Sequence, residues 1–195
     1  MKKLALIAVA FVMTAATSFA GIDGSKHDFV DGASSANQFG NRICGPCHVP
    51  HNADKTTPPL WDHTETSATF TYYDLPGDKN DDPTSLDSYS KLCMSCHDGT
   101  VNLDAYNGAT GTKKITGTAL LGTSLANDHP VNVNLESTDT NYYTGYKAPT
   151  NALVTGSLST VSCASCHDPH GGVTGTKLLR TSNVGSALCL DCHDK

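Results

Sequence analysis

The octapeptide C-A-S-C-H-D-P-H occupies residues 163–170, and a near copy, C-G-P-C-H-V-P-H, occupies residues 44–51. Both contain the pattern C-x-x-C-H, which occurs again at residues 93–97 and 189–193. These four motifs use every cysteine of the chain: Cys44, Cys47, Cys93, Cys96, Cys163, Cys166, Cys189 and Cys192. One repeated pattern therefore organises the whole sequence.

C-x-x-C-H is the signature of covalent haem attachment. Its two thiols form thioether bonds to the porphyrin, and the histidine that follows is the proximal ligand of the iron. The proximal histidines are His48, His97, His167 and His193. Zinc sites, disulfides and redox dithiols also use paired cysteines, but none of them requires a histidine after every pair. The sequence thus predicts four c-type haems.

The second axial ligand of each iron is predicted to be histidine. Methionine is the other common choice, but Met1 and Met13 lie in residues 1–20, which are predicted to be removed as a signal peptide, and Met94 lies inside a motif. Five histidines lie outside the motifs as distal candidates, of which four are needed: His27, His51, His63, His129 and His170. Irons with two histidine ligands have no open position, which favours electron transfer at low potential over bond chemistry.

The fold class follows from the composition. Trp61 is the only tryptophan, and polar residues and glycine dominate the stretches between motifs. Ordering such a chain costs about 1–2 kcal/mol per residue, which few apolar side chains can offset. We therefore expect a loop-rich multihaem cytochrome fold with few short helices and minimal strand, in which the haems form the core. Short helices should lead into Cys93 and Cys189.

Residues 1–20 are predicted to be a secretory signal peptide. Lys2 and Lys3 precede a short apolar run, and small residues end at Ala20. Its removal would leave 11 basic and 19 acidic side chains. That balance argues against a nucleic-acid partner, and the short run argues against stable membrane insertion. We expect an exported protein, periplasmic or extracellular at the cell surface, that exchanges electrons with other redox proteins.

The remaining residues, 21–195, are predicted to form one domain with two haem-pair halves. The halves cover about residues 40–100 and 160–195, and a Gly/Thr/Asn-rich insert joins them. Each half begins with C-x-x-C-H-x-P-H and ends with S-x-L-C-x-x-C-H-D, as expected for a repeated unit.

Several motifs resemble the doubled C-x-x-C-H multihaem cytochromes c. They are C-x-x-C-H-x-P-H-N, the P-L-W-x-H of residues 59–63, the C-x-x-C-H-D-G of residues 93–99 and the H-P-V of residues 129–131. More narrowly, the chain is similar to the OmcE-type filament-forming tetrahaem cytochromes. That resemblance implies four bis-histidine haems in a closely stacked chain. It also implies a homopolymer in which one iron is completed by a histidine of the neighbouring subunit, for which His27 is the natural candidate; ligation within its own chain is the alternative.

These observations predict an electron carrier, not an enzyme. The resemblance adds the prediction that copies of this carrier polymerise into a filament. A monomeric periplasmic electron shuttle is the first alternative. A small multihaem reductase, which would need one five-coordinate iron, is the second.

The histidine after the proline in each octapeptide is expected to serve a different haem from that of its own motif. His51 follows His48 by three residues, a reach of at most about 10–11 Å, and Pro50 restricts the backbone between them. We therefore expect His51 to ligate the second haem and, by the repeat, His170 to ligate the fourth.

Overall fold

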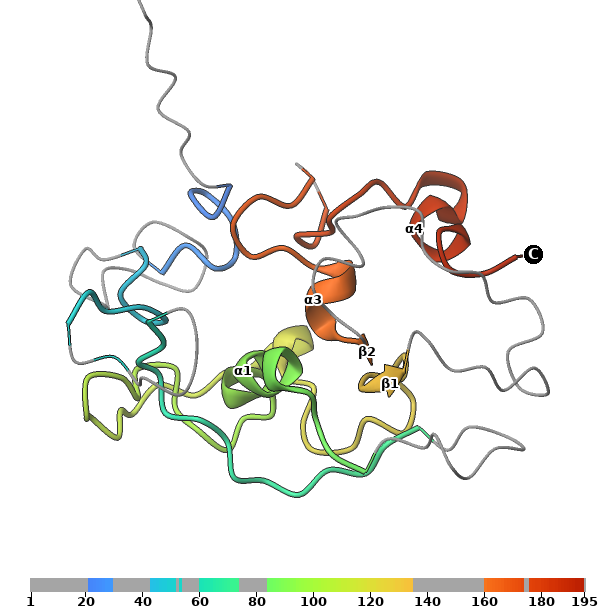
Figure 1. Ribbon diagram of the computed structural model, residues 1–195. Coiled ribbons are helices and arrows are strands. Elements are labelled where there is room, and N and C mark those ends of the chain that lie inside the picture. Colours follow the sequence, from blue (N-terminus) through green and yellow to red (C-terminus); the bar gives the residue numbers. More distant parts are fainter. Residues whose placement is uncertain are drawn as a thin grey trace, which may run out of the picture.

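The computed structural model describes residues 21–29, 43–51, 53, 60–73, 84–134, 160–173 and 176–194. The predicted signal peptide at 1–20 and much of the insert, residues 135–159, lie outside the described residues. Loops predominate in the described ranges, as the sequence predicted (Figure 1).

The regular elements are few and short (Figure 1). In chain order they are α1 (Ser88–His97), the 3-10 turn η1 (Gly117–Ala119), β1 (Val133–Asn134), β2 (Thr160–Val161), α3 (Cys163–Cys166), the 3-10 turn η2 (Val184–Ser186) and α4 (Ala187–Leu190). The expected helices leading into Cys93 and Cys189 are confirmed as α1 and as η2 with α4. None of the described helices has the length and apolar character needed to span a bilayer.

The longest helix, α1, is defined by signals at both ends. The carboxylate of Asp87 accepts hydrogen bonds from the backbone N–H groups of Tyr89 and Ser90, each at 3.0 Å, and so caps the amino terminus. At the other end Gly99 adopts a left-handed φ of +76°, which a residue without a Cβ adopts readily. The helix therefore ends within two residues of His97.

Two contacts join the first and second halves of the chain around α1. Helix α1 packs against α3, where the hydroxyl of Ser90 accepts a 3.0 Å hydrogen bond from the backbone N–H of Cys163. Strand β2, directly before α3, pairs antiparallel with β1, with Val133 opposite Val161. The third motif is thereby held next to the second.

The segment 60–73 runs from the first motif to α1. Its Asp62 N–H donates to the carbonyl of Cys47 at 3.0 Å, and its Thr66 N–H donates to the hydroxyl of Ser95 at 3.0 Å. Thr66 also donates to the buried carboxylate of Asp98. This segment therefore spans the first and second motifs.

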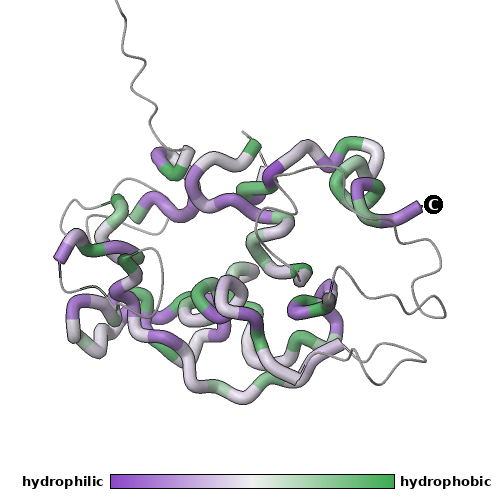
Figure 2. Tube along the Cα trace, viewed as in Figure 1, coloured by the Kyte–Doolittle hydropathy of each residue, from purple (hydrophilic) through white to green (hydrophobic). Residues whose placement is uncertain are grey.

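Side chains alone supply only a small core. Five buried apolar residues are found in the described ranges: Trp61, Met94, Ala105, Leu125 and Val133. The buried polar residues are Asp28, His63, Thr66, Ser90, Ser95, Asp98, Ser162 and Ser165. Apolar and polar positions alternate along the tube in Figure 2 without forming one apolar layer. The expectation that bound haems complete the core fits this scarcity.

Candidate haem-binding site

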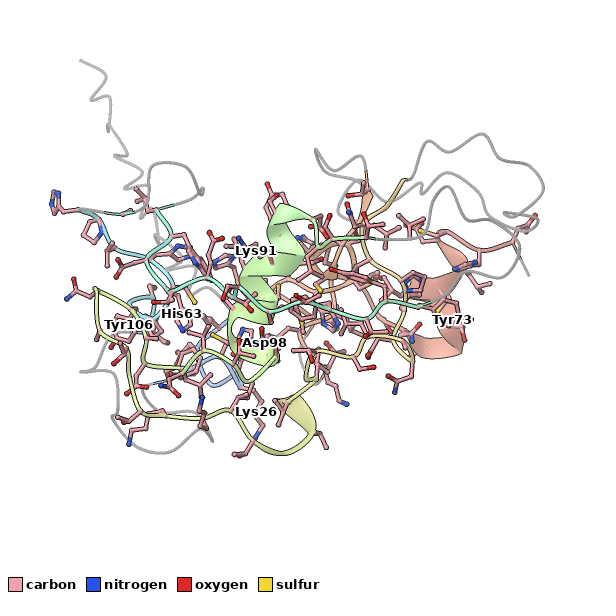
Figure 3. All side chains as sticks on the ribbon, turned by 90° about the horizontal axis from the view of Figure 1, so that it is seen from below. Lys26, His63, Tyr73, Lys91, Asp98 and Tyr106 are labelled. Atoms are coloured by element: carbon pink, nitrogen blue, oxygen red, sulfur yellow. The ribbon has the colours of Figure 1, made fainter. Side chains whose placement is uncertain are left out.

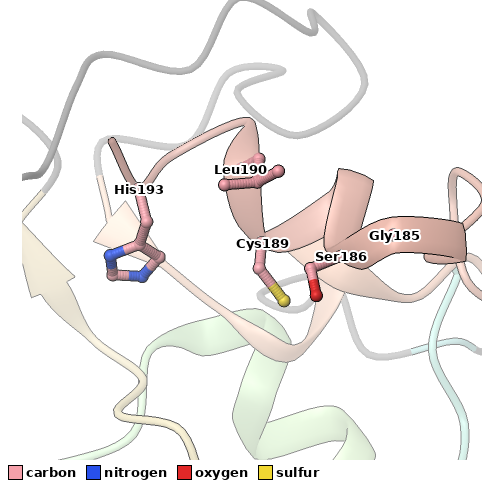
Figure 4. A pocket seen from close by; sticks show the side chains of 5 residues that line it. All are labelled: Gly185, Ser186, Cys189, Leu190 and His193. Carbon is pink, nitrogen blue, oxygen red and sulfur yellow. The ribbon is translucent and has the colours of Figure 1, made fainter. Parts of the chain in front are cut away.

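Each C-x-x-C-H motif folds as a tight helical turn. In the first, third and fourth motifs the histidine N–H donates to the carbonyl of the first cysteine, at 2.9, 3.0 and 2.9 Å. The second motif forms the last turn of α1. Such a turn places residues four apart on one face. Figure 4 shows this at the fourth motif, where the side chains of Cys189 and His193 line the same pocket.

All eight cysteines carry free thiols, so the structure does not support the disulfide alternative. The described ranges also hold no group of three or more His, Cys, Asp or Glu side chains arranged around a metal ion. Two tetrahedral zinc sites would need such groups. The motifs keep the free cysteine pairs that thioether attachment requires.

Backbone carbonyls fix the orientation of several imidazoles. The Nδ1 atom of His97 lies 2.8 Å from the carbonyl oxygen of Ala119, and that of His167 lies 2.8 Å from the carbonyl of Lys177. His129, outside the motifs, has its Nδ1 at 2.9 Å from the carbonyl of Pro130. A metal-binding histidine commonly donates its other ring N–H in this way. In all three residues Nε2 is the nitrogen left for iron.

Three pairs of histidine rings lie close together, and each pair joins a motif histidine to a non-motif histidine. The ring centroids are 5.9 Å apart for His48 and His170, and 5.9 Å apart for His97 and His27. They are 6.2 Å apart for His193 and His129. An imidazole nitrogen binds a transition metal at about 2 Å, so two imidazoles on opposite faces of one iron have ring centres roughly 6 Å apart. The spacing of all three pairs suits one iron between them.

The half-buried imidazole of His27 is held neutral. Burial, together with repulsion from a positive charge on His97, lowers the pKa of His27 from 6.5 to about 4. The neutral ring carries the lone pair that a metal requires. His27 is therefore in its coordinating form at pH 7.

Electrostatic effects and one hydrogen bond between thiols link each motif to the next in chain order. Burial raises the pKa of Cys96 to about 12, and the nearby Cys47 thiol of the first motif contributes to that rise. A hydrogen bond with Cys163 raises the pKa of Cys93, so the second and third motifs touch. Burial, with the fourth-motif thiol of Cys192 next in effect, raises the pKa of Cys166. Neighbouring attachment sites thus run one, two, three, four through the molecule.

The ring pairs differ from two of the distal assignments expected from the sequence. His170 was expected to serve the fourth motif, but its ring lies beside His48 of the first. His27 was the candidate to reach a neighbouring subunit, but its ring lies beside His97 of its own chain. Both differences have one cause: the loops fold back across the molecule, and distance along the sequence does not report that path. Ligation of His27 within its own chain was the alternative left open by the sequence.

The last two candidates, His51 and His63, have different surroundings. His51 is exposed, and within the described residues its ring forms no pair with another imidazole. The ring of His97, which His51 was expected to serve, lies beside His27. His63 is only 4% exposed, with both ring nitrogens near backbone carbonyls. Sequence reasoning missed the carbonyls that orient the rings, because a backbone acceptor has no side-chain signature.

Comparison with known proteins agrees with this geometry over the last part of the chain. A search of curated proteins found no match. A scan against protein families matched residues 156–195 to the doubled CXXCH motif. The matched residues contain the third and fourth motifs. Residues 156–195 therefore carry the doubled attachment motif of the multihaem c-type cytochromes.

Proposed function

We propose that this protein is a tetrahaem c-type cytochrome that transfers electrons, with haem attached at all four motifs. The observation that carries the proposal is the set of three histidine pairs, each joining a motif to a non-motif residue at 5.9–6.2 Å between ring centroids. When bound, haem c supplies a one-electron redox centre. Multihaem cytochromes are typically electron carriers, although the family also includes reductases.

Different side chains would hold the porphyrin and the iron of each haem. The two thiols and the histidine of a motif would hold its haem covalently and through the iron. His170, His27 and His129 would supply a second imidazole at the first, second and fourth motifs. Ligation by two imidazoles favours a lower potential than ligation by histidine and methionine.

The thiol contacts support a route that passes from each motif to the next. Cys47 lies near Cys96, Cys93 bonds to Cys163, and Cys166 lies near Cys192. Because each sulfur marks the rim of its own haem, neighbouring rims are brought together at every step. Electrons would enter at one terminal motif and leave at the other.

A haem count on the purified protein tests this proposal. The pyridine haemochrome assay, with intact mass, should give four covalent haems per chain, and electron paramagnetic resonance should show low-spin iron. Fewer than three covalent haems per chain would refute the tetrahaem proposal. Abundant high-spin iron in the wild-type protein would instead favour a reductase.

A second candidate function is end-to-end electron transfer through a polymer of this chain. It is supported by the open edge at the fourth motif, where Cys189 is exposed and the apolar side chain of Val184 is 84% exposed. A pocket there is lined by Gly185, Ser186, Cys189, Leu190 and His193 (Figure 4). His27 does not support it, because its ring lies within its own chain.

Light scattering and electron microscopy of the protein distinguish the polymer from the monomeric electron shuttle. Filaments containing this chain would support the polymer. A monomer at all concentrations, with no filaments on the cell exterior, would support the soluble periplasmic shuttle instead.

A further inference from the structure

Five non-motif histidines are available for four irons, and the structure distinguishes the two that form no histidine pair. Three of the five already face a motif histidine. Of the remaining two, His51 lies on an exposed turn, whereas His63 is buried. The different surroundings of His51 and His63 indicate different roles for the two residues.

Both ring nitrogens of His63 lie within hydrogen-bonding distance of backbone carbonyls, and the tautomer of the ring decides which nitrogen carries the N–H. Its Nδ1 lies 2.9 Å from the carbonyl oxygen of Thr64, and its Nε2 lies 3.0 Å from the carbonyl oxygen of Asn102. The backbone around it is held to the same region, because the N–H of Thr64 donates to the carbonyl of Ala105 at 2.8 Å. His63 also forms an isolated antiparallel bridge with Tyr106, and the two lie close together in Figure 3. Moving His63 onto an iron would break this attachment.

The ring of His63 also contacts the second motif at the wrong point for an axial ligand. Its Nε2 is 3.4 Å from the sulfur of Cys96, and its Nδ1 is 4.0 Å from the same atom. After attachment that sulfur is a thioether at the rim of the porphyrin, whereas an axial nitrogen sits over the centre. A ring nitrogen in contact with the rim sulfur therefore cannot bind the iron of that haem.

We propose that His63 is not an iron ligand but a positioning residue, which holds Cys96 and the segment 60–66 and, in the tautomer with an N–H on Nε2, shares that N–H between the Asn102 carbonyl and the thioether sulfur. The segment that carries it bridges the first two motifs through Asp62 and Thr66. This inference rests on the proposed function, because it concerns how the second haem is held.

By the repeat, we expect His51 to be the ligand for the third motif. The two octapeptides are near copies, and the ring of His170 of the second copy lies 5.9 Å from that of His48 of the first. A reciprocal arrangement would bring His51 of the first copy to His167 of the second. His167 already has its Nδ1 fixed by the carbonyl of Lys177 at 2.8 Å, so its Nε2 is directed to iron.

Spin state and haem potential in matched variants of the full chain test the assignment. His63→Ala should keep all four irons low-spin and lower the midpoint potential of one haem, because a donor to the sulfur is lost. His63→Gln, which keeps a side-chain donor, should return that potential toward the wild-type value. His51→Ala should convert about one quarter of the iron to high spin, since one motif in four loses its ligand.

High-spin iron in His63→Ala or His63→Gln would overturn the proposal, as would four unchanged potentials in His63→Ala. If His63→Ala does not fold, the spin state of His63→Gln decides. Fewer than four haems in the wild-type protein would refute the proposed function. High-spin iron confined to the His63 variants would refute this assignment alone.

Discussion

Replacing His170 by alanine tests the histidine pairs most directly. The ring of His170 lies 5.9 Å from that of His48, so its loss should remove the distal ligand of the first haem alone. With four haems per chain, one iron in four should become high-spin, which is about 25% of the total. Electron paramagnetic resonance with spin quantification measures this fraction, and a haemochrome assay confirms that four haems remain attached.

The affected haem can be identified by combining His170→Ala with loss of one attachment site. In a chain with Cys44→Ser and Cys47→Ser, the first haem is absent, so His170→Ala should add no high-spin iron. In a chain with Cys189→Ser and Cys192→Ser, the fourth haem is absent, and His170→Ala should convert one iron in three. The matched control is His129→Ala, whose ring faces His193, and it should give the opposite pattern. If His170→Ala behaves as predicted for His129→Ala, the reasoning from ring pairs is refuted.

Two further predictions concern stability. Ser90→Ala removes the buried hydroxyl that accepts a hydrogen bond from the N–H of Cys163. It should lower the free energy of unfolding, measured by denaturant titration, by about 1–3 kcal/mol. Ser88→Ala, at an exposed position, is the control, and an equally small loss in both variants would contradict the proposed role of this contact. Gly99→Ala places a side chain at φ +76° and against Leu120, and should cost more than the roughly 1–2 kcal/mol of the backbone change alone. Gly108→Ala, at φ +75° with no neighbouring atom near the added Cβ, measures the cost of the backbone conformation alone. Equal melting temperatures for Gly99→Ala and Gly108→Ala would show that the Leu120 side chain moves aside at no cost.

The attachment motifs and their local structure could be predicted from the sequence because they depend on neighbouring residues. The turn at Cys163–His167 and the helix ending at His97 are examples, since spacing and capping determine both. The histidine partners could not be predicted, because the path of a loop decides them. His170 is three residues from His167 yet faces His48, and His27 faces His97 across about 70 residues of chain.

The short strands and the ring-orienting carbonyls were also beyond sequence reasoning. Strands β1 and β2 have two residues each, which is too short to show an alternating pattern. The carbonyls of Ala119 and Lys177 accept from histidine rings through backbone atoms that every residue has. Long-range chain geometry, not residue type, selects them.

The pairing of His48 with His170 has a consequence for maturation of the chain. During synthesis the first motif emerges about 120 residues before the histidine that lies beside it. The first iron would therefore wait with one protein ligand until the second half arrives, and the bond to His170 would join the two halves late. Linking residues about 100 apart removes unfolded-state entropy worth roughly 4–5 kcal/mol in the chain-entropy model. This late bond would thus hold the two halves together, because neither half could then unfold without breaking the coordination bond between His170 and the first iron.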